Sequence, residues 1–131
     1  MTRYTLHSMA LGLALAVLLA AVPAAHHSFD AEFDRDKTID ITGVVTKVDW
    51  VNPHAFVYVD SRDEQGEVTR YKIEMGPPYA LVRGGWTRNT LKVGDTVTVK
   101  GAALAKDGSP AAGSLQTTSM NLADGRSLTM R

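Results

Sequence analysis

The fold is decided by residues 39–50, which read IDITGVVTKVDW. Apolar and polar side chains alternate along this stretch, and a period of two is typical of a β-strand with one buried face. Gly43 lies where a bend or a β-bulge would fit. Because a strand that serves both halves of a small barrel has to bend, the stretch predicts a long first strand of such a barrel.

Three later segments carry a similar pattern and predict further strands at residues 55–60, 68–75 and 96–104. Gly76-Pro77-Pro78 ends the third of the four strands, because proline lacks the N–H group that a strand ladder needs. After this joint we expect short helices at residues 79–83 and 87–91, the second with Thr87 as its N-cap.

The order of these elements predicts an all-β protein. Three strands, a short helical insert between strands 3 and 4, and two or three further strands match a small five-stranded barrel of the OB type. Asp124-Gly125 predicts a tight turn between the last two strand segments. A β-sandwich is the alternative, but its usual seven strands are hard to find in this sequence.

The N-terminal segment has the three parts of a secretory signal peptide. Arg3 supplies a positive charge, residues 9–21 are an uninterrupted apolar run, and small residues follow. A transmembrane anchor is the alternative, although spanning a bilayer takes about 20 apolar residues. We expect a signal peptide at residues 1–24, an N-terminal arm at 25–38 and an OB-like barrel domain at 39–131. The mature protein would be periplasmic and would not associate with the membrane.

The charge balance and the lack of cysteine make several classes of function unexpected for this protein. The chain has 14 basic and 14 acidic side chains, and nucleic-acid-binding domains usually carry a clear basic excess, so we expect no nucleic-acid partner. The absence of cysteine excludes disulfides, thiolate catalysis and cysteine-ligated metal sites. No nucleophile elbow or phosphate-binding loop is found, so we do not expect an enzyme.

The expected mature N-terminus contains two adjacent histidines. Cleavage after Ala24 would begin the chain with Ala25-His26-His27, whose amine, two backbone amides and third-position imidazole form the four in-plane nitrogens that Cu(II) or Ni(II) prefers. Cleavage after Ala25 would make His26 terminal, and its amine and ring would chelate one copper ion together with another histidine. Either cut predicts a copper-binding terminus. The alternative is a pair of solvated histidines with no metal role.

His54 is the fourth predicted metal ligand, beside Ala25, His26 and His27. It follows Asn52-Pro53 at a strand entry, where a proline-fixed turn holds a side chain in one orientation. As a ligand it would offer a neutral imidazole nitrogen, with a backbone carbonyl or Asn52 setting the tautomer. The alternative is a structural hydrogen bond across the barrel mouth.

A small-ligand site is predicted at four residues, namely Trp50, Asn52, Arg83 and Trp86. Arg83 would receive a carboxylate or phosphate through its planar guanidinium group, and Trp86 would offer a stacking face. The alternative is that Trp86 is a buried ring that plugs one end of the barrel and that Arg83 pairs with Glu74 or Asp95.

Four short elements resemble one known family. They are HHSF at residues 26–29, VDWVNPH at 48–54, RGGWTR at 83–88 and LKVGD at 91–95. Together they resemble the DUF6152 family of small exported bacterial proteins of unassigned function. The resemblance implies an exported single domain and a bacterial source, but it implies no reaction and no ligand.

We therefore expect a non-catalytic periplasmic module that binds copper, another metal or a small ligand through its histidine-rich mature N-terminus. Copper is the cofactor that these residues favour most. The alternative is a protein- or peptide-interaction module of the cell envelope that uses an aromatic barrel face. Its contact residues would be Trp50, Phe56, Tyr58, Tyr71 and Trp86.

Overall fold

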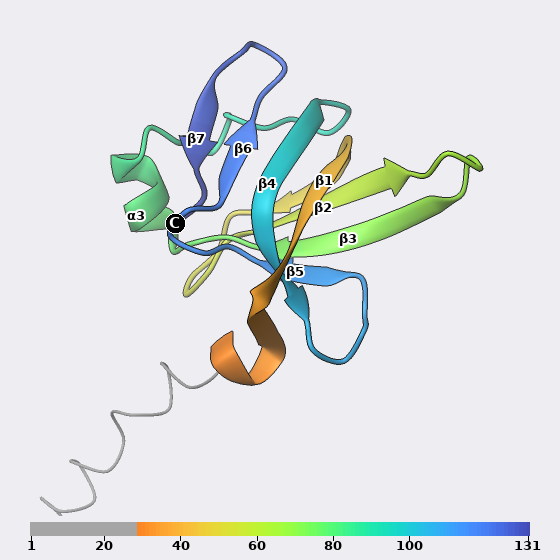
Figure 1. Ribbon diagram of the computed structural model, residues 1–131. Coiled ribbons are helices and arrows are strands. Elements are labelled where there is room, and N and C mark those ends of the chain that lie inside the picture. Colours follow the sequence, from red (N-terminus) through yellow and green to blue (C-terminus); the bar gives the residue numbers. More distant parts are fainter. Residues whose placement is uncertain (1–28) are drawn as a thin grey trace, which may run out of the picture. The chain divides into compact units, whose positions relative to one another are not determined.

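The computed structural model describes residues 29–131 and is built mostly of β-strands (Figure 1). The chain divides into two compact units, residues 1–31 and 32–131, and the second unit holds all the strands. Residues 29–32 form a short helical turn. Within residues 29–131, no helix combines the length and the apolar character needed to cross a membrane.

Five of the strands close into a ring. Strands β1, β2, β3, β5 and β4 are hydrogen-bonded in that order, and β4 pairs again with β1. The β3–β5 pair is parallel and the others are antiparallel. The elements are β1 (Phe33–Asp49), β2 (Phe56–Arg62), β3 (Val68–Glu74), α3 (Pro78–Arg83), β4 (Thr96–Ala105), β5 (Ala111–Gly113), β6 (Ser119–Asn121) and β7 (Ser127–Thr129). The expected all-β class is confirmed.

Strand β1 pairs with two different neighbours along its length. Its first part, from Phe33 to Val44, pairs with β4, and its last part, from Val44 to Asp49, pairs with β2. The register with β2 shifts between Val45 and Lys47, which is the kind of irregularity that bends a strand. The long, bent first strand expected from residues 39–50 is therefore present, and it begins at Phe33, six residues before residue 39.

Gly43 lies where β1 passes closest to the backbone of β2. A Cβ atom at this position would lie 2.7 Å from the carbonyl carbon of Asp60 and 2.8 Å from Cγ1 of Val59. Both distances are shorter than any ordinary carbon–carbon contact, which is about 3.5–4.0 Å. The close approach of the two strands therefore requires glycine at this point.

The interior of the ring is filled by side chains that alternate along the strands. On β2, for example, Val57 and Val59 are fully buried while Tyr58 between them is half-buried. Trp86 belongs to the same cluster, and its indole Nε1 donates a hydrogen bond to the carbonyl oxygen of Thr129 at 2.7 Å. The largest fully buried side chains are those of Trp86, Ile41, Ile73, Met75, Leu81, Met120 and Met130.

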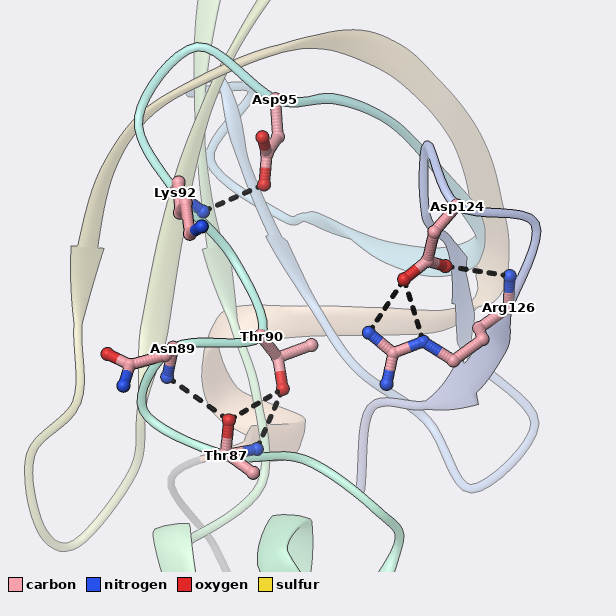
Figure 2. Close-up of polar contacts among 7 residues, drawn as sticks. All are labelled: Thr87, Asn89, Thr90, Lys92, Asp95, Asp124 and Arg126. Carbon is pink, nitrogen blue, oxygen red and sulfur yellow. Dashed lines mark hydrogen bonds and ion pairs between the residues drawn. The ribbon is translucent and has the colours of Figure 1, made fainter.

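The insert between β3 and β4 contains one helix rather than two. The first expected helix is present as α3, but residues 87–91 form a turn. The N–H group of Thr87 donates to Oγ1 of Thr90 at 2.8 Å, and Oγ1 of Thr87 accepts from the N–H group of Asn89 at 3.2 Å (Figure 2). Threonine hydroxyls that bond to nearby backbone groups compete with helix formation, so the expectation of a second helix was wrong.

Strands β6 and β7 form a hairpin that is attached to β4 beside the ring. Its turn contains the expected Asp124-Gly125 pair, and the N–H group of Gly125 donates to the carbonyl oxygen of Leu122 at 3.0 Å. The hairpin is tied to the end of β3, because the N–H group of Gly76 donates to the carbonyl oxygen of Met130 at 2.8 Å.

Candidate functional site

His54 and Glu74 form the polar pair at the centre of the candidate site. The ring Nδ1 of His54 lies 2.8 Å from Oε1 of Glu74. The His54 side chain is 33% exposed and the Glu74 side chain only 13% exposed, so the carboxylate is the more buried partner and the imidazole ring is partly exposed. Nδ1 is therefore the ring nitrogen that contacts Glu74, and Nε2 is the other nitrogen of the imidazole.

The backbone on both sides of the pair is fixed by the sheet. His54 lies between β1 and β2, directly after Pro53. The N–H group of Ala55 donates to the carbonyl oxygen of Gly76 at 3.2 Å, and the N–H group of Met75 donates to that of Ala55 at 2.8 Å. These bonds continue the β2–β3 ladder past Glu74, and therefore hold His54 and Glu74 at neighbouring positions of two paired segments.

Burial raises the pKa of Glu74 above its ordinary value. Attraction to His54 acts in the opposite direction, as do the charges of Arg131 and Lys72, whereas repulsion from Glu32 raises the pKa further. The net effect is a raised pKa, because the loss of solvation outweighs the nearby positive charges. The ionised carboxylate of Glu74 is therefore costly to bury, and His54 is the largest favourable contribution that offsets this cost.

We expect the ionisation of Glu74 to lower the stability of the native state as the pH rises. The folded pKa lies above the unfolded value of 4.5, so the folded chain binds this proton more readily than the unfolded chain. The stability contributed by Glu74 is thus fully present below the unfolded pKa and is lost as the pH rises through the folded pKa. Glu74→Gln cannot ionise. Urea unfolding should therefore show the native protein losing stability relative to Glu74→Gln as the pH rises above 4.5, the unfolded pKa. A constant difference between the two would contradict this expectation.

Three of the four predicted metal ligands, Ala25, His26 and His27, lie outside the described residues. The fourth is His54, whose carboxylate partner is Glu74. Within residues 29–131, no group of three or more histidine, aspartate or glutamate side chains is arranged to hold a metal ion.

The four residues predicted for a small ligand lie in different environments. Trp50 and Trp86 line one crevice together with Met75 and Leu91, but this crevice has no room for a water molecule. Asn52 is exposed in the loop before His54, and Arg83 is exposed on α3 with its guanidinium carbon 6.0 Å from the centre of the Tyr79 ring. No cavity described in residues 29–131 is lined by all four.

The sequence alone suggested Glu74 as a partner of Arg83 but did not identify it as the partner of His54. Its position on the third strand was predicted, but the partner of His54 depends on the register between β2 and β3. In that register Glu74 lies opposite Phe56, two residues after His54. The sequence did show an acidic residue near the end of the third strand and a histidine just before the second strand. Recognising them as partners required the register between the two strands.

A polar hollow of about 270 Å³ lies between the loop before β4 and the β6–β7 turn. Many of its polar groups are bonded within their own turns (Figure 2). The carboxylate of Asp95 accepts from the N–H group of Lys92 at 2.8 Å, and Asp124 forms an ion pair with Arg126 at 2.8 Å. These contacts explain the shape of the two loops without a ligand.

Comparison with known proteins identifies one family. A search of curated proteins finds no match, and neither does a search of solved structures. One family model, described as a family of unknown function (DUF6152), matches residues 14–114, so the match includes the whole five-stranded ring and ends before β6. The resemblance read from the four sequence elements is thus confirmed, and the chain belongs to the DUF6152 family.

Proposed function

We propose that this protein is an exported, non-catalytic periplasmic module that binds a metal ion, with copper as the preferred metal. In this proposal the five-stranded ring is an OB-like barrel. The closure of β1 on β4, the parallel β3–β5 pair and the position of α3 between β3 and β4 support that assignment. The barrel would present His54, and the mature N-terminus would supply Ala25, His26 and His27.

The pairing of His54 with Glu74 is the observation that carries the proposal. Histidines that bind metals almost always donate their second ring N–H to a carboxylate, a carbonyl or water, which fixes the tautomer and raises the basicity of the free nitrogen. At 2.8 Å from Glu74, a neutral His54 would donate from Nδ1 and present Nε2 as the metal-binding nitrogen. A partly exposed imidazole above a nearly buried carboxylate has the composition expected of such a ligand and its supporting residue.

The chemistry of the full ligand set favours copper over zinc. Amine, amide and imidazole nitrogens prefer Cu(II), which also stands above Zn(II) in the general order of affinities. Because the chain has no cysteine, it offers no thiolate that would favour zinc or an iron–sulfur cluster. The nitrogen donors of the terminus together with His54 would form a copper-selective set.

The alternative, a protein- or peptide-interaction module with an aromatic face, has less support. Trp86 is buried in the core, and Trp50 and Tyr71 pack against it. Of the five aromatic side chains, Phe56 and Tyr58 are left on the outer face of the sheet, and a lysine ammonium lies over each ring. The five aromatic side chains of this alternative therefore do not share one exposed face.

Calorimetric titration with Cu(II) tests the proposal on the correctly processed protein. A version with one extra N-terminal residue keeps every imidazole but moves the free amine out of the chelate, and we expect it to bind copper at least about 100-fold more weakly. Glu74→Gln should weaken binding by about 10-fold to 100-fold, because loss of a supporting carboxylate has this effect in known metal sites. His54→Ala should weaken binding by at least as much as Glu74→Gln.

A matched control and two contrary outcomes make this experiment decisive. Glu64→Gln removes one carboxylate from the exposed β2–β3 turn and should leave copper affinity unchanged. Equal affinity of the processed and extended forms would rule out a site at the terminus. Equal affinity of the native protein and His54→Ala would remove His54 from the site, even if the terminus alone binds copper.

A further inference from the structure

The backbone of β3 uses one of its two sides to pair with β2 and the other to pair with β5. On the β5 side, Lys72 donates its N–H group to the carbonyl oxygen of Pro110 at 3.0 Å, and the carbonyl oxygen of Glu74 accepts a bond of 2.9 Å from the residue after β5. Backbone groups alternate between the two sides of a strand. Val68 and Arg70 therefore direct their N–H and C=O groups to the same side as Lys72 and Glu74.

The pairing of β3 with β5 does not reach Val68 and Arg70. It begins at Lys72, and it cannot continue by one more bond because Pro110 has no N–H group. Within residues 29–131, no backbone group bonds to the outward N–H and C=O groups of Val68 and Arg70. Figure 1 shows the β2–β3 hairpin extending beyond β5. We call this side of residues 68–71 the open edge.

The open edge lacks the features that usually prevent a strand from pairing with another molecule, such as proline, a bulge or a projecting charge. Residues 68–71 read VTRY, without proline, and the β2–β3 register has no shift. The charge of Arg70 is directed back over β2, because its guanidinium group donates to both carboxylate oxygens of Asp60, at 2.6 and 2.8 Å. Val68 is 44% exposed. The edge can therefore accept a further strand.

We propose that the open edge pairs with the open edge of a second copy of this chain, antiparallel and around a twofold axis at Thr69. Val68 of one copy then lies opposite Arg70 of the other, and the two residues exchange both of their N–H···O=C bonds. The twofold axis repeats this exchange, so every outward backbone group of Val68 and Arg70 gains a partner. Val68 packs against the aliphatic part of Arg70, whose charge stays with Asp60.

The bonding pattern disfavours the two neighbouring registers. A shift by two residues in one direction would place Arg70 opposite Arg70 of the second copy, and like charges directly opposite one another are destabilising. It would also require Lys72 to release Pro110. A shift in the other direction would place Arg70 opposite Gly66, whose N–H group is already bonded within the β2–β3 turn. The register with Thr69 on the axis avoids both conflicts.

The shortness of the open edge favours a second copy over a peptide from another protein. A bound peptide gains its affinity from consecutive main-chain bonds, and the edge ends at the turn on one side and at β5 on the other. A second copy brings a strand that β2 already holds in an extended conformation, so less conformational entropy is lost on pairing. Twofold contacts are also the commonest way in which identical chains assemble.

Thr69→Cys tests the register directly, because the chain has no cysteine of its own. In the proposed dimer the two Cα atoms at position 69 stand about 4.5 Å apart, a separation that a disulfide can bridge. We expect oxidation with diamide to convert most of this variant into a covalent dimer on non-reducing electrophoresis. Glu64→Cys is the matched control in the exposed turn of the same hairpin. Its two copies would lie about 34 Å apart, and it should form less than a tenth as much dimer.

Sedimentation equilibrium measures the association of the native protein, with a chelator present to exclude dimers bridged by metal. We expect a reversible dimer with a Kd between about 10 µM and about 1 mM, because the contact is smaller than the interfaces of stable complexes. Thr69→Lys places like charges opposite one another on the axis and should weaken association at least tenfold. Thr69→Val keeps the branched shape and should change the Kd less than threefold. Thr69 is exposed, and thermal unfolding should confirm that both variants fold.

Amide hydrogen exchange shows what covers the open edge. The N–H groups of Val68 and Arg70 should exchange rapidly in dilute protein and become protected as the dimer forms, whereas that of Thr69, which faces β2, should be protected throughout. Four results would overturn the inference. They are no dimer at about 1 mM, equal cross-linking of Thr69→Cys and Glu64→Cys, equal association of Thr69→Lys and Thr69→Val, and protection of Val68 and Arg70 that does not depend on concentration. The last result would mean that another part of the same chain covers the edge.

Discussion

Replacing Gly43 with alanine should destabilise the protein by about 4 kcal/mol or more, which places it among the largest effects of a single substitution. The added methyl group would lie 2.7 Å from the carbonyl carbon of Asp60 and closer still to its oxygen. Both are backbone atoms of a strand paired on both sides, so neither can move without breaking the β1–β2 or the β2–β3 ladder. Urea unfolding followed by circular dichroism measures the loss.

Gly66→Ala is the matched control for Gly43→Ala. Gly66 has a φ of +86°, but a methyl group at this position would meet no other atom within 4 Å. Its replacement should cost about 1 kcal/mol, from the strained backbone alone. A cost at Gly43 no larger than the cost at Gly66 would show that β1 and β2 can separate at this point, and that the close approach is not required by the fold.

Trp86→Ala should destabilise the protein by about 3–5 kcal/mol, the usual cost of removing a large aromatic side chain from a core. The ring is 1% exposed and packs in the cluster that fills the five-stranded ring. Trp86→Phe separates packing from hydrogen bonding, because it keeps most of the apolar contact and loses the bond from Nε1 to Thr129. We expect it to cost about 1–2 kcal/mol.

Equilibrium unfolding in urea distinguishes these two contributions. If Trp86→Phe costs as much as Trp86→Ala, the bond to Thr129 rather than core packing holds the β7 segment in place. If both variants cost less than about 1 kcal/mol, Trp86 does not contribute to the stability of the core. Trp50 remains in both variants and serves as a fluorescence probe of the folded state.

The strands could be predicted from the sequence because their pattern is local. The alternation in residues 39–50 depends only on which side chains must face the core, and it located most of β1. The start of β1 was not visible, because residues 33–38 are mostly charged and are held by pairing with β4, about 65 residues later in the chain. The turn at residues 87–91 was missed because helix propensity and threonine side-chain bonding compete over so short a segment.

The candidate site was predicted only in part, for a related reason. His54 could be selected from its place after a proline, but Glu74 becomes its partner only through the β2–β3 register. The ion pair between Arg70 and Asp60 has the same origin, since the two residues come from β3 and β2 and meet only when these strands pair. Residues that act together across strands leave no signal at a fixed spacing in the sequence.

The two-sided pairing of β1 also has a consequence for the order of folding. Its contacts with β2 join residues 7–16 positions apart, whereas its contacts with β4 join residues 52–72 positions apart. Because closing a long loop costs more entropy than closing a short one, we expect the β1–β2–β3 meander to form first and β4 to complete the ring afterwards. Until then the N-terminal half of β1 has no partner strand. When the N-terminal residues appear first, as in synthesis, this segment has to avoid pairing with other molecules until residues 96–105 are available to it.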